Sequence, residues 1–483
     1  MVSISGRSKA CIDCKRRRVK CDLAQPLCRR CSKAGIPCQG YKRPPTIWVN
    51  RTLERPDVTA YSAIVSSPWL PRDPRLRRLH LLDQLKAECD LPDRDPLQFR
   101  TRALQILRGT YLPSKRADDP YPSPTSWLEA VEEVKAPCNA LDKALLAFCA
   151  IQVRVAGEGS IAYDDTVQMY NGALGEVIKD LSNGNAASDE TLCSIVTISL
   201  CELFLFSKDG SSAFHALGIS EILRRRGATQ PSHHWSSLVV RLCIHCTVTS
   251  LSQARALTLA PDEWRVLLGP AVPESWNHLL KTAVEVPYLL EKAELLIEKG
   301  DRGLMASQHK DVLLYWLHEL ERWRSQKPSY WVVPARLENP ADISYNDKLF
   351  PFALHFRSIA HAMEWMFCSA LMLQILDAAL RLERLGTSMP SDALTDGSLE
   401  IRDDGDKLAR LLCQCFEYCS GPENGTFAAQ AAYSTQLAVQ SYFRHRGLVR
   451  ELAWSKAISD GNGGLRFGIG LRILEKEQRH VAS

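Results

Sequence analysis

Residues 11–38 read CIDCKRRRVKCDLAQPLCRRCSKAGIPC, and this stretch decides how the first part of the chain folds. Its cysteines follow the spacing C-x2-C-x6-C-x6-C-x2-C-x6-C, so that one unit is used twice. Two C-x2-C pairs at short range are the sequence mark of tetrahedral zinc–thiolate sites. The predicted metal ligands are Cys11, Cys14, Cys21, Cys28, Cys31 and Cys38. A module of about 30 residues cannot bury enough apolar surface to fold alone, so we expect metal binding to supply its folding free energy.

The number of ions follows from counting ligands. Structural zinc takes four ligands, so one ion would leave two of the six thiols idle, whereas two ions need eight ligand positions. Six thiolates fill eight positions only if two of them bridge both ions. The repeat suggests that the bridging residues are equivalent, and Cys11 and Cys28 each open one half. The sequence therefore predicts two Zn²⁺ ions per chain, in a cluster with a formal charge of −2.

Positive charge is concentrated around these cysteines. Between Cys14 and Cys21 the chain reads KRRRVK, and residues 1–50 carry a net charge of +10, whereas the rest of the chain carries −5. Some of these basic residues are expected to hold the cluster thiolates deprotonated, so not all are free for other contacts. A basic arm on a nearly neutral body is the electrostatic footprint of a polyanion-binding module.

The stretch from Ala10 to Cys38 resembles the fungal binuclear zinc cluster (C6 zinc finger) of transcription factors, including Pro26 and Gly35. The resemblance implies two short helices, each followed by an extended segment, and reading of CGG-like triplets from the major groove of double-stranded DNA. By position, Arg17 and Arg18 match its base-contacting pair. The positions that it places near phosphates are occupied by Arg16 and Lys20. Arginine favours bidentate contact with guanine.

Two other interpretations of the cysteines and one of the basic run are compatible with parts of the pattern. Three disulfides would suit a secreted mini-domain, but Met1 to Lys9 contains no apolar signal-peptide core,. The cysteines could also form a zinc-dependent protein-interaction module that never reads DNA. The basic run could be a solvated helix face or a nuclear import signal, and import is compatible with DNA binding.

Residues 41–75 are predicted to be a Pro-rich linker between the zinc module, residues 8–40, and a large body, residues 76–483,. A coiled coil would be expected to show three or more heptads. The leucines from Leu76 to Leu85 cover little more than one, and Pro92 and Pro96 follow. The protein therefore either dimerises through its body or binds DNA as a monomer; a single module would bind weakly, which favours the homodimer.

The body is predicted to be all-helical. Ser126 to Glu129 has the pattern of a capping box, and no set of alternating strands appears. Leu192 to Phe206 is too short and interrupted for a membrane span, so no membrane partner is expected,. Stripes of apolar residues at helical spacing occur in 141–155, 167–181, 192–206, 214–226, 278–300, 307–324, 353–385, 406–419 and 427–446,.

The body resembles the fungal-specific transcription factor domain, best from Trp127 to Gly227 and more weakly from Leu437 to Gly464. The family usually has Trp where Phe214 stands. The resemblance implies an all-helical regulatory domain that docks transcriptional coregulators or responds to an effector.

Four further groups could carry chemistry, but an ordinary structural role is favoured for each. Free buried cysteines suit a reducing nuclear or cytosolic compartment. Histidine in a helix is more often a packed residue than a ligand, and basic residues before a glycine are a helix C-terminus signal. The groups are Cys243, His245 and Cys246; Cys413, Cys415 and Cys419; His215; and Arg224 to Arg226.

No enzyme motif is present: the sequence lacks H-E-x-x-H, G-x-S-x-G, a Walker loop and a G-x-G-x-x-G after a strand,. We therefore expect a nuclear, zinc-dependent DNA-binding regulator of RNA polymerase II genes and not an enzyme. Genes of nutrient or secondary metabolism are typical targets of the family. The sequence does not identify the genes, the effector or the sign of regulation.

Overall fold

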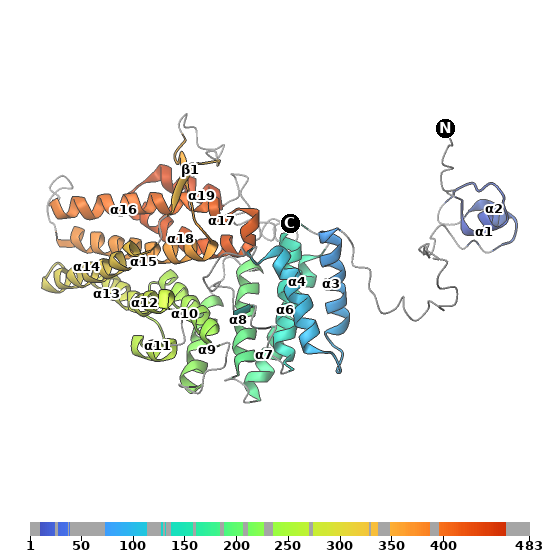
Figure 1. Ribbon diagram of the computed structural model, residues 1–483, viewed down its shortest axis with the longest axis horizontal. Coiled ribbons are helices and arrows are strands. Elements are labelled where there is room, and N and C mark those ends of the chain that lie inside the picture. Colours follow the sequence, from blue (N-terminus) through green and yellow to red (C-terminus); the bar gives the residue numbers. More distant parts are fainter. Residues whose placement is uncertain are drawn as a thin grey trace, which may run out of the picture. The chain divides into compact units, whose positions relative to one another are not determined.

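The computed structural model divides the chain into two compact units, Met1–Trp69 and Leu70–Ser483, which are treated separately below. Figure 1 shows both. The structure describes residues 10–24, 28–36, 38, 73–113, 127–128, 131, 137–157, 161–183, 188–205, 211–226, 235–269, 274–327, 330–336, 348–386 and 396–459.

The first unit contains two short helices, α1 (Ile12–Arg16) and α2 (Arg29–Lys33), which pack against each other. Among its described residues, the buried hydrophobic positions are Cys11, Cys14, Cys28 and Cys31. Since the core of this unit is made of sulfur atoms, the expectation of a metal-folded module with two short helices is consistent with its structure.

The second unit begins with helices that pack into one bundle, visible side by side in both figures. Its helices are α3 (Pro74–Glu88), α4 (Pro96–Thr110), α6 (Asn139–Val155), α7 (Tyr163–Ser182) and α8 (Asp189–Leu205). Asp73 and Asp95 each cap a helix whose first residue is proline, by accepting hydrogen bonds from backbone N–H groups at its start,. Pro96 therefore begins a helix here.

A second group of helices packs around α15 (Ile359–Gly386). Between the two groups lies α10 (Trp235–Ser252), which contacts both α8 and α18. The remaining helices are α9 (Ser211–Arg226), α11 (Pro261–Leu268), α12 (Glu274–Ala283), α13 (Val286–Glu298), α14 (Leu304–Ser325), α16 (Asp396–Gln414), α17 (Phe416–Cys419), the 3-10 helix η2 (Pro422–Asn424), α18 (Gly425–Arg446) and α19 (Val449–Ser459).

The start of α18 is held against the end of α4 at a glycine. Gly425 has φ +61°, and a Cβ there would overlap the carbonyl group of Tyr111. The Phe427 N–H donates to that carbonyl at 3.1 Å, and the Tyr111 hydroxyl donates to Gln430 at 2.7 Å. Only glycine permits this close approach of two backbones. It ties the two helix groups together and fixes one end of α18.

The predicted class of a cysteine cluster followed by a mostly helical body is confirmed, but three helix predictions were wrong in detail. The run 278–300 is two helices, because Pro287 stands in the first turn of α13 and cannot continue a helix from α12,. The run 406–419 is interrupted at Cys415 and begins earlier, at Asp396. The run 353–385 begins with a strand.

That strand belongs to a two-stranded antiparallel hairpin, which the sequence analysis did not foresee. β1 (Trp331–Pro334) pairs with β2 (Phe352–His355), with Val332 opposite Leu354. Ala353 and Leu354 are buried, whereas Phe352 is exposed, so β2 lacks a clean alternation. A run of four residues cannot be distinguished from the start of a helix by periodicity alone.

Within the described residues, one helical segment, Ile359–Leu385 in α15, is long and apolar enough to cross a membrane by length and composition. However, 83% of its apolar window is buried inside the protein, as expected for the central helix of a core.

Several sequence predictions lie outside the described residues. These are most of the linker, Ser126 and Glu129 of the capping box, and Gly227 after α9.

Candidate metal centre and nucleic-acid interface

The repeat in the sequence is also a repeat in the structure. Cys11 directly precedes α1, and Cys28 directly precedes α2; the next cysteine of each half, Cys14 or Cys31, lies inside the helix. The two helices thus present equivalent sulfur atoms, and their packing brings the two halves of the cysteine repeat together.

Both helices end in the same way. The N–H of Val19 donates to the carbonyl of Cys14 at 3.0 Å, and the N–H of Ile36 donates to that of Cys31 at 3.0 Å. Between each donor and its helix lies a residue with positive φ, Arg18 at 56° and Gly35 at 64°. This is the Schellman type of helix ending, in which glycine is the favoured residue. The first half therefore places an arginine where the second half has glycine, at a conformational cost of about 1 kcal/mol.

The sulfur atoms lie at distances that suit a shared metal. Cys14 Sγ is 3.6 Å from Cys28 Sγ, and Cys11 Sγ is 3.8 Å from Cys31 Sγ. A tetrahedral zinc with bonds of about 2.3 Å holds its sulfur ligands about 3.8 Å apart, whereas a disulfide bond is about 2.05 Å long. All six cysteines are free thiols, so the disulfide interpretation is not supported.

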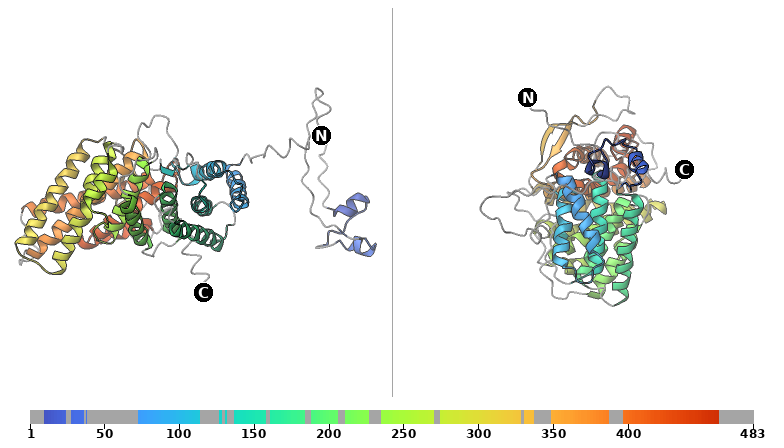
Figure 2. Two further views of the ribbon diagram at one scale, coloured as in Figure 1. Left: turned by 90° about the horizontal axis from the view of Figure 1, so that it is seen from below. Right: turned by 90° about the vertical axis from the view of Figure 1, so that its right-hand side faces the viewer.

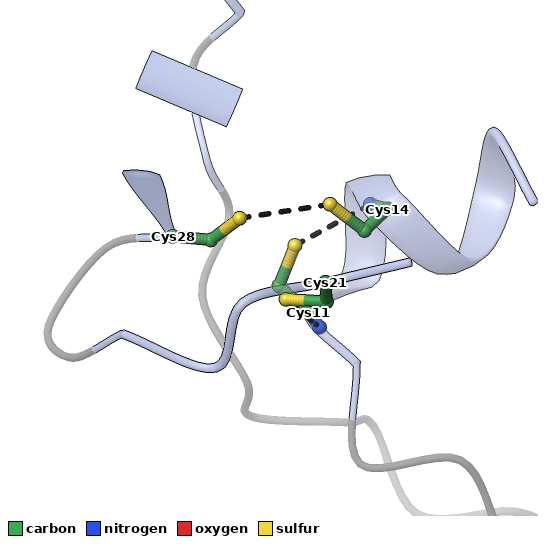
Figure 3. Close-up of side chains that lie close together, drawn as sticks. All are labelled: Cys11, Cys14, Cys21 and Cys28. Carbon is green, nitrogen blue, oxygen red and sulfur yellow. Dashed lines mark hydrogen bonds between the residues drawn. The ribbon is translucent and has the colours of Figure 1, made fainter. Parts of the chain in front are cut away.

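The six sulfur atoms form two groups that share one residue. Cys11, Cys14, Cys21 and Cys28 form one group, drawn in Figure 3. Cys11 also belongs to a second group, whose other members are Cys31 and Cys38. Within each group all ligand atoms lie within 4.8 Å of one another. The first group can complete a tetrahedral site alone, whereas the second needs a fourth ligand. Because Cys11 belongs to both groups, its position suits a ligand shared by two metal ions. The bridging role of Cys28 stays a prediction.

The chemistry of this donor set fits zinc. Burial raises the pKa of Cys11 to about 12, and those of Cys14 and Cys31 to about 11. A zinc ion that binds here must therefore displace protons from the thiols. Backbone N–H groups already point at the sulfur atoms, since Cys14 N donates to Cys11 Sγ at 3.3 Å and Cys11 N donates to Cys21 Sγ at 3.4 Å.

Arg17 faces the cluster rather than solvent. Its Nη2 donates to Cys31 Sγ at 3.5 Å, which links the first half of the repeat to the second. Burial lowers the pKa of Arg17. Hydrogen bonds to the sulfur atoms of Cys14 and Cys31, together with the charges of these cysteines, raise the pKa by more than burial lowers it, so the net shift is upward. Arg17 is therefore placed to offset the negative charge of the thiolates, and its predicted base contact stays a prediction.

The other three predicted DNA-contact residues lie on the surface. Arg18 and Lys20 are exposed, and the Arg16 side chain is 69% exposed although its Nη2 reaches Asp13 Oδ1 at 2.8 Å. Three further basic side chains, which the sequence analysis did not single out, are exposed on α2. They are Arg29, Arg30 and Lys33. A polyanion would therefore meet basic side chains from both helices of the module.

Asp22 is a further residue whose role was not predicted from the sequence. Its Oδ2 accepts a hydrogen bond from the N–H of Arg29 at 3.2 Å, at the start of α2. A hydrogen bond from the Cys28 thiol is the largest cause of its lowered pKa. Asp22 precedes the helix by several residues, so it does not fit the sequence signal of an N-cap.

The candidate groups in the helical unit mostly have structural roles. Cys243 and Cys246 are buried in α10, and Cys246 Sγ lies 3.9 Å from the carbonyl of Ala216. His215 Nε2 is 2.7 Å from Glu202 Oε1, as expected of a packed, hydrogen-bonded histidine. Cys413, Cys415 and Cys419 are free and buried.

The expectation that Arg224 to Arg226 form a solvated helix end holds for Arg224 and Arg225, which are exposed. It was wrong for Arg226, whose side chain is 11% exposed. The Arg226 guanidinium pairs with Asp189 and lies over the ring of Trp235, 4.4 Å from its centroid. This pairing joins α9 to α8 and α10.

Comparison with known proteins gives matches in the zinc module. Residues 9–46 match the family model of the fungal Zn(2)-Cys(6) binuclear cluster domain. Similar curated proteins are the aspercryptin biosynthesis cluster-specific transcription regulator atnN of Emericella nidulans, 55% identical over 40 residues, and the arginine metabolism regulation protein II of Saccharomyces cerevisiae, 51% identical over 39 residues. The phomenoic acid biosynthesis cluster-specific transcriptional regulator of Leptosphaeria maculans is 51% identical over 37 residues.

Each of these matches covers 8% of this chain and only 7%, 4% and 7% of the respective relatives. No solved structure matches the chain. The similarity is thus strong but confined to the cysteine-rich module.

Proposed function

We propose that this chain, which carries a fungal Zn(2)-Cys(6) binuclear cluster domain in residues 9–46, is a zinc-dependent, sequence-specific DNA-binding transcription factor. The observation that carries the proposal is the gathering of six thiols at zinc-ligand spacing within a shell of exposed basic side chains. The protein acts in the nucleus on genes transcribed by RNA polymerase II, and it is not an enzyme.

The module holds two Zn²⁺ ions, with Cys11 and Cys28 bridging them. The presence of Cys11 in both sulfur groups supports this arrangement. Bound zinc supplies the fold and carries out no reaction. The cysteines hold the two helices in position around the metal, and the helices in turn position the basic side chains.

Arg18 reads bases in the major groove of a CGG-like triplet. The backbone supports this role, because Arg18 occupies a left-handed position that its counterpart Gly35 fills without strain. Strained residues of this kind are concentrated at functional sites. Arg16 and Lys20 contact phosphates and fix the register, whereas Arg17 divides its charge between the cluster and the DNA,.

The helical unit is the regulatory part, as an all-helical fungal-specific transcription factor domain. It supplies the homodimer contact and docks transcriptional coregulators. The names of these three relatives refer to arginine metabolism and to the biosynthesis of two natural products. We therefore place the target genes in metabolism, including secondary metabolism.

Selection of bound sequences from random DNA duplexes by the full-length, zinc-loaded protein tests the proposal. We expect enrichment of a CGG-like triplet and a steep loss of affinity as salt rises, since Lys and Arg release counterions from phosphates. If no triplet is enriched and salt has little effect, the module is instead a zinc-dependent protein-interaction module.

A further inference from the structure

The helical unit contains a cavity of about 670 Å³ between its two groups of helices. Its walls come from α8, α10, α13, α15 and α18, with Trp276 of α12. Cavities of roughly 300–1,000 Å³ are typical of sites for small organic ligands. Exposed residues, including Gln253 and Arg444, also line it, so the cavity opens to solvent on that side.

One wall of the cavity is apolar. Met363, Met366, Phe367 and Leu371 of α15 line it, together with Leu290 of α13. Methionine side chains are flexible and polarizable, so this wall can adapt to apolar groups of different shapes. A ligand for this cavity would therefore carry an apolar body.

The α10 part of the lining carries Arg241. Its side chain is half-buried, and burial lowers the pKa of its guanidinium. Among the described residues it makes no hydrogen bond or ion pair; its interactions are electrostatic only, with Tyr111 and with His245. A half-buried guanidinium without an anionic partner is unfavourable unless a ligand supplies the missing charge.

The acidic residues of the cavity are already paired with other groups. Glu294 Oε2 accepts a hydrogen bond from Arg381 Nη2 at 2.8 Å, and Asp377 Oδ2 lies 2.6 Å from His445 Nδ1. Glu202 is bonded to Tyr170 and His215. None of these carboxylates pairs with Arg241. Among the described residues, Arg241 is therefore a cation of the cavity lining that has no ion pair.

His245 lies one helical turn beyond Arg241, so both side chains are on the face of α10 that lines the cavity,. The Nε2 of His245 is buried and has no hydrogen-bond partner among the described residues. Burial and the nearby Arg241 charge lower the pKa of His245 to about 3, so the ring is neutral near pH 7. It offers a second polar contact without a second charge.

We propose that this cavity binds a small organic acid, whose carboxylate pairs with Arg241 and hydrogen-bonds to His245 while its apolar body lies on the methionine-rich wall of α15. The planar fork of a guanidinium matches a carboxylate with two parallel hydrogen bonds. A neutral or cationic ligand would leave Arg241 unpaired, and a dianion would find one guanidinium on the buried wall. The proposal is independent of whether the N-terminal module reads DNA.

Calorimetric titration of the full-length, zinc-loaded protein tests it with two matched pairs of probes. One pair is 2-naphthoate and 2-naphthylmethanol; the other is octanoate and 1-octanol. In at least one pair the acid should bind about tenfold or more tightly than its neutral alcohol, as a charge-assisted hydrogen bond requires. Equal affinity of acid and alcohol in both pairs, or no binding of either acid, would overturn the proposal.

Variants then assign the preference to one residue. Arg241→Met keeps an unbranched side chain in the wall but removes the charge, so the preference for the acid should vanish while alcohol binding persists. Arg444→Met removes an exposed guanidinium at the opening and should leave the preference unchanged. Undiminished acid binding by a folded Arg241→Met protein would contradict the proposal. The comparison of acid with alcohol in the wild-type protein remains decisive if that variant does not fold.

Discussion

The zinc module and the helical unit both bury cysteine, but they use it in opposite ways. In the module, sulfur atoms of different cysteines lie 3.6–3.8 Å apart and form the core. In the helical unit, eleven cysteines are free, and ten of them are buried. The thiol contacts described there reach oxygen atoms, as when Cys149 Sγ lies 3.4 Å from the carbonyl of Ala103, or the thioether of Met366, and none reaches a second thiol. Convergence of several thiols on one another, not burial of the thiol, distinguishes the candidate ligands from core residues.

The two regions also differ in what keeps them folded. The helical unit has an extensive apolar core that includes Trp264, Phe99 and Phe148, whereas the described core of the module is four cysteines. A core of that size cannot offset the entropy lost on folding. Loss of zinc should thus unfold the first unit and leave the second intact.

The largest expected effect comes from replacing one cysteine in each region. Cys14→Ser removes a ligand and should abolish both the fold of the module and DNA binding, since zinc supplies about 10–16 kcal/mol in small zinc domains. Cys246→Ser should cost the helical unit about 1–3 kcal/mol, because a hydroxyl replaces a buried thiol. Zinc content and DNA affinity check both variants. Loss of zinc from Cys246→Ser, or its full retention by Cys14→Ser, would erase the distinction between the regions.

Disruption of a buried ion pair should destabilise the helical unit without affecting zinc binding by the module. Asp142 accepts hydrogen bonds from Arg100, whose side chain is fully buried, at 2.8 Å and from Arg94 at 2.9 Å. Asp142→Asn leaves buried positive charge uncompensated and should lower the free energy of unfolding of the helical unit by about 3–5 kcal/mol. Asp404→Asn, at an exposed pair with Lys407, should cost less than about 1 kcal/mol,. Denaturant titration measures both, and zinc content should not change in either.

On the DNA side, the contrast lies between two exposed arginines of the module. Arg18→Ala should cost about 1–3 kcal/mol of binding free energy and relax base preference at one position, because a base contact is lost. Arg30→Ala, on α2, should weaken all sequences equally and only slightly, as expected for a residue near phosphate. Competition binding with single-base variants of the selected site separates the two effects. A uniform loss in Arg18→Ala would show that Arg18 contacts phosphate alone.

The last expected effect is a gradual pH dependence of stability, which arises from His245 in the helical unit. Its folded-state pKa is lowered to about 3, while the unfolded chain titrates near 6.5,. Between these values only the unfolded chain takes up the proton, so the free energy of unfolding falls as pH decreases, by up to about 1.4 kcal/mol per unit. His245→Gln should flatten this part of the profile, because it removes the group that takes up the proton on unfolding. Identical slopes in wild type and His245→Gln would contradict the assignment.

The sequence was most informative where chemistry imposes spacing. Tetrahedral coordination requires cysteines at fixed separations, so the six ligand candidates could be recognised without a structure. Helices with long apolar stripes, such as α14, were also predictable, because periodicity reports which face is buried,.

The parts that could not be predicted depend on tertiary contacts. In a run of three arginines, the sequence does not show that the side chain of Arg17, and not that of a neighbour, contacts Cys31. The hairpin of β1 and β2 is too short to show a period. Arg241 gave a weak signal, a single charge within the apolar run of α10, but only the packing of α10 beside the cavity gives it meaning.

The most direct test of the account is the zinc content of the intact protein, measured by elemental analysis before and after a strong chelator, together with the helical circular dichroism signal. The account predicts two zinc ions per chain, both removable, with the helical unit still folded afterwards. No bound zinc, or collapse of the helical unit when zinc is removed, would contradict it.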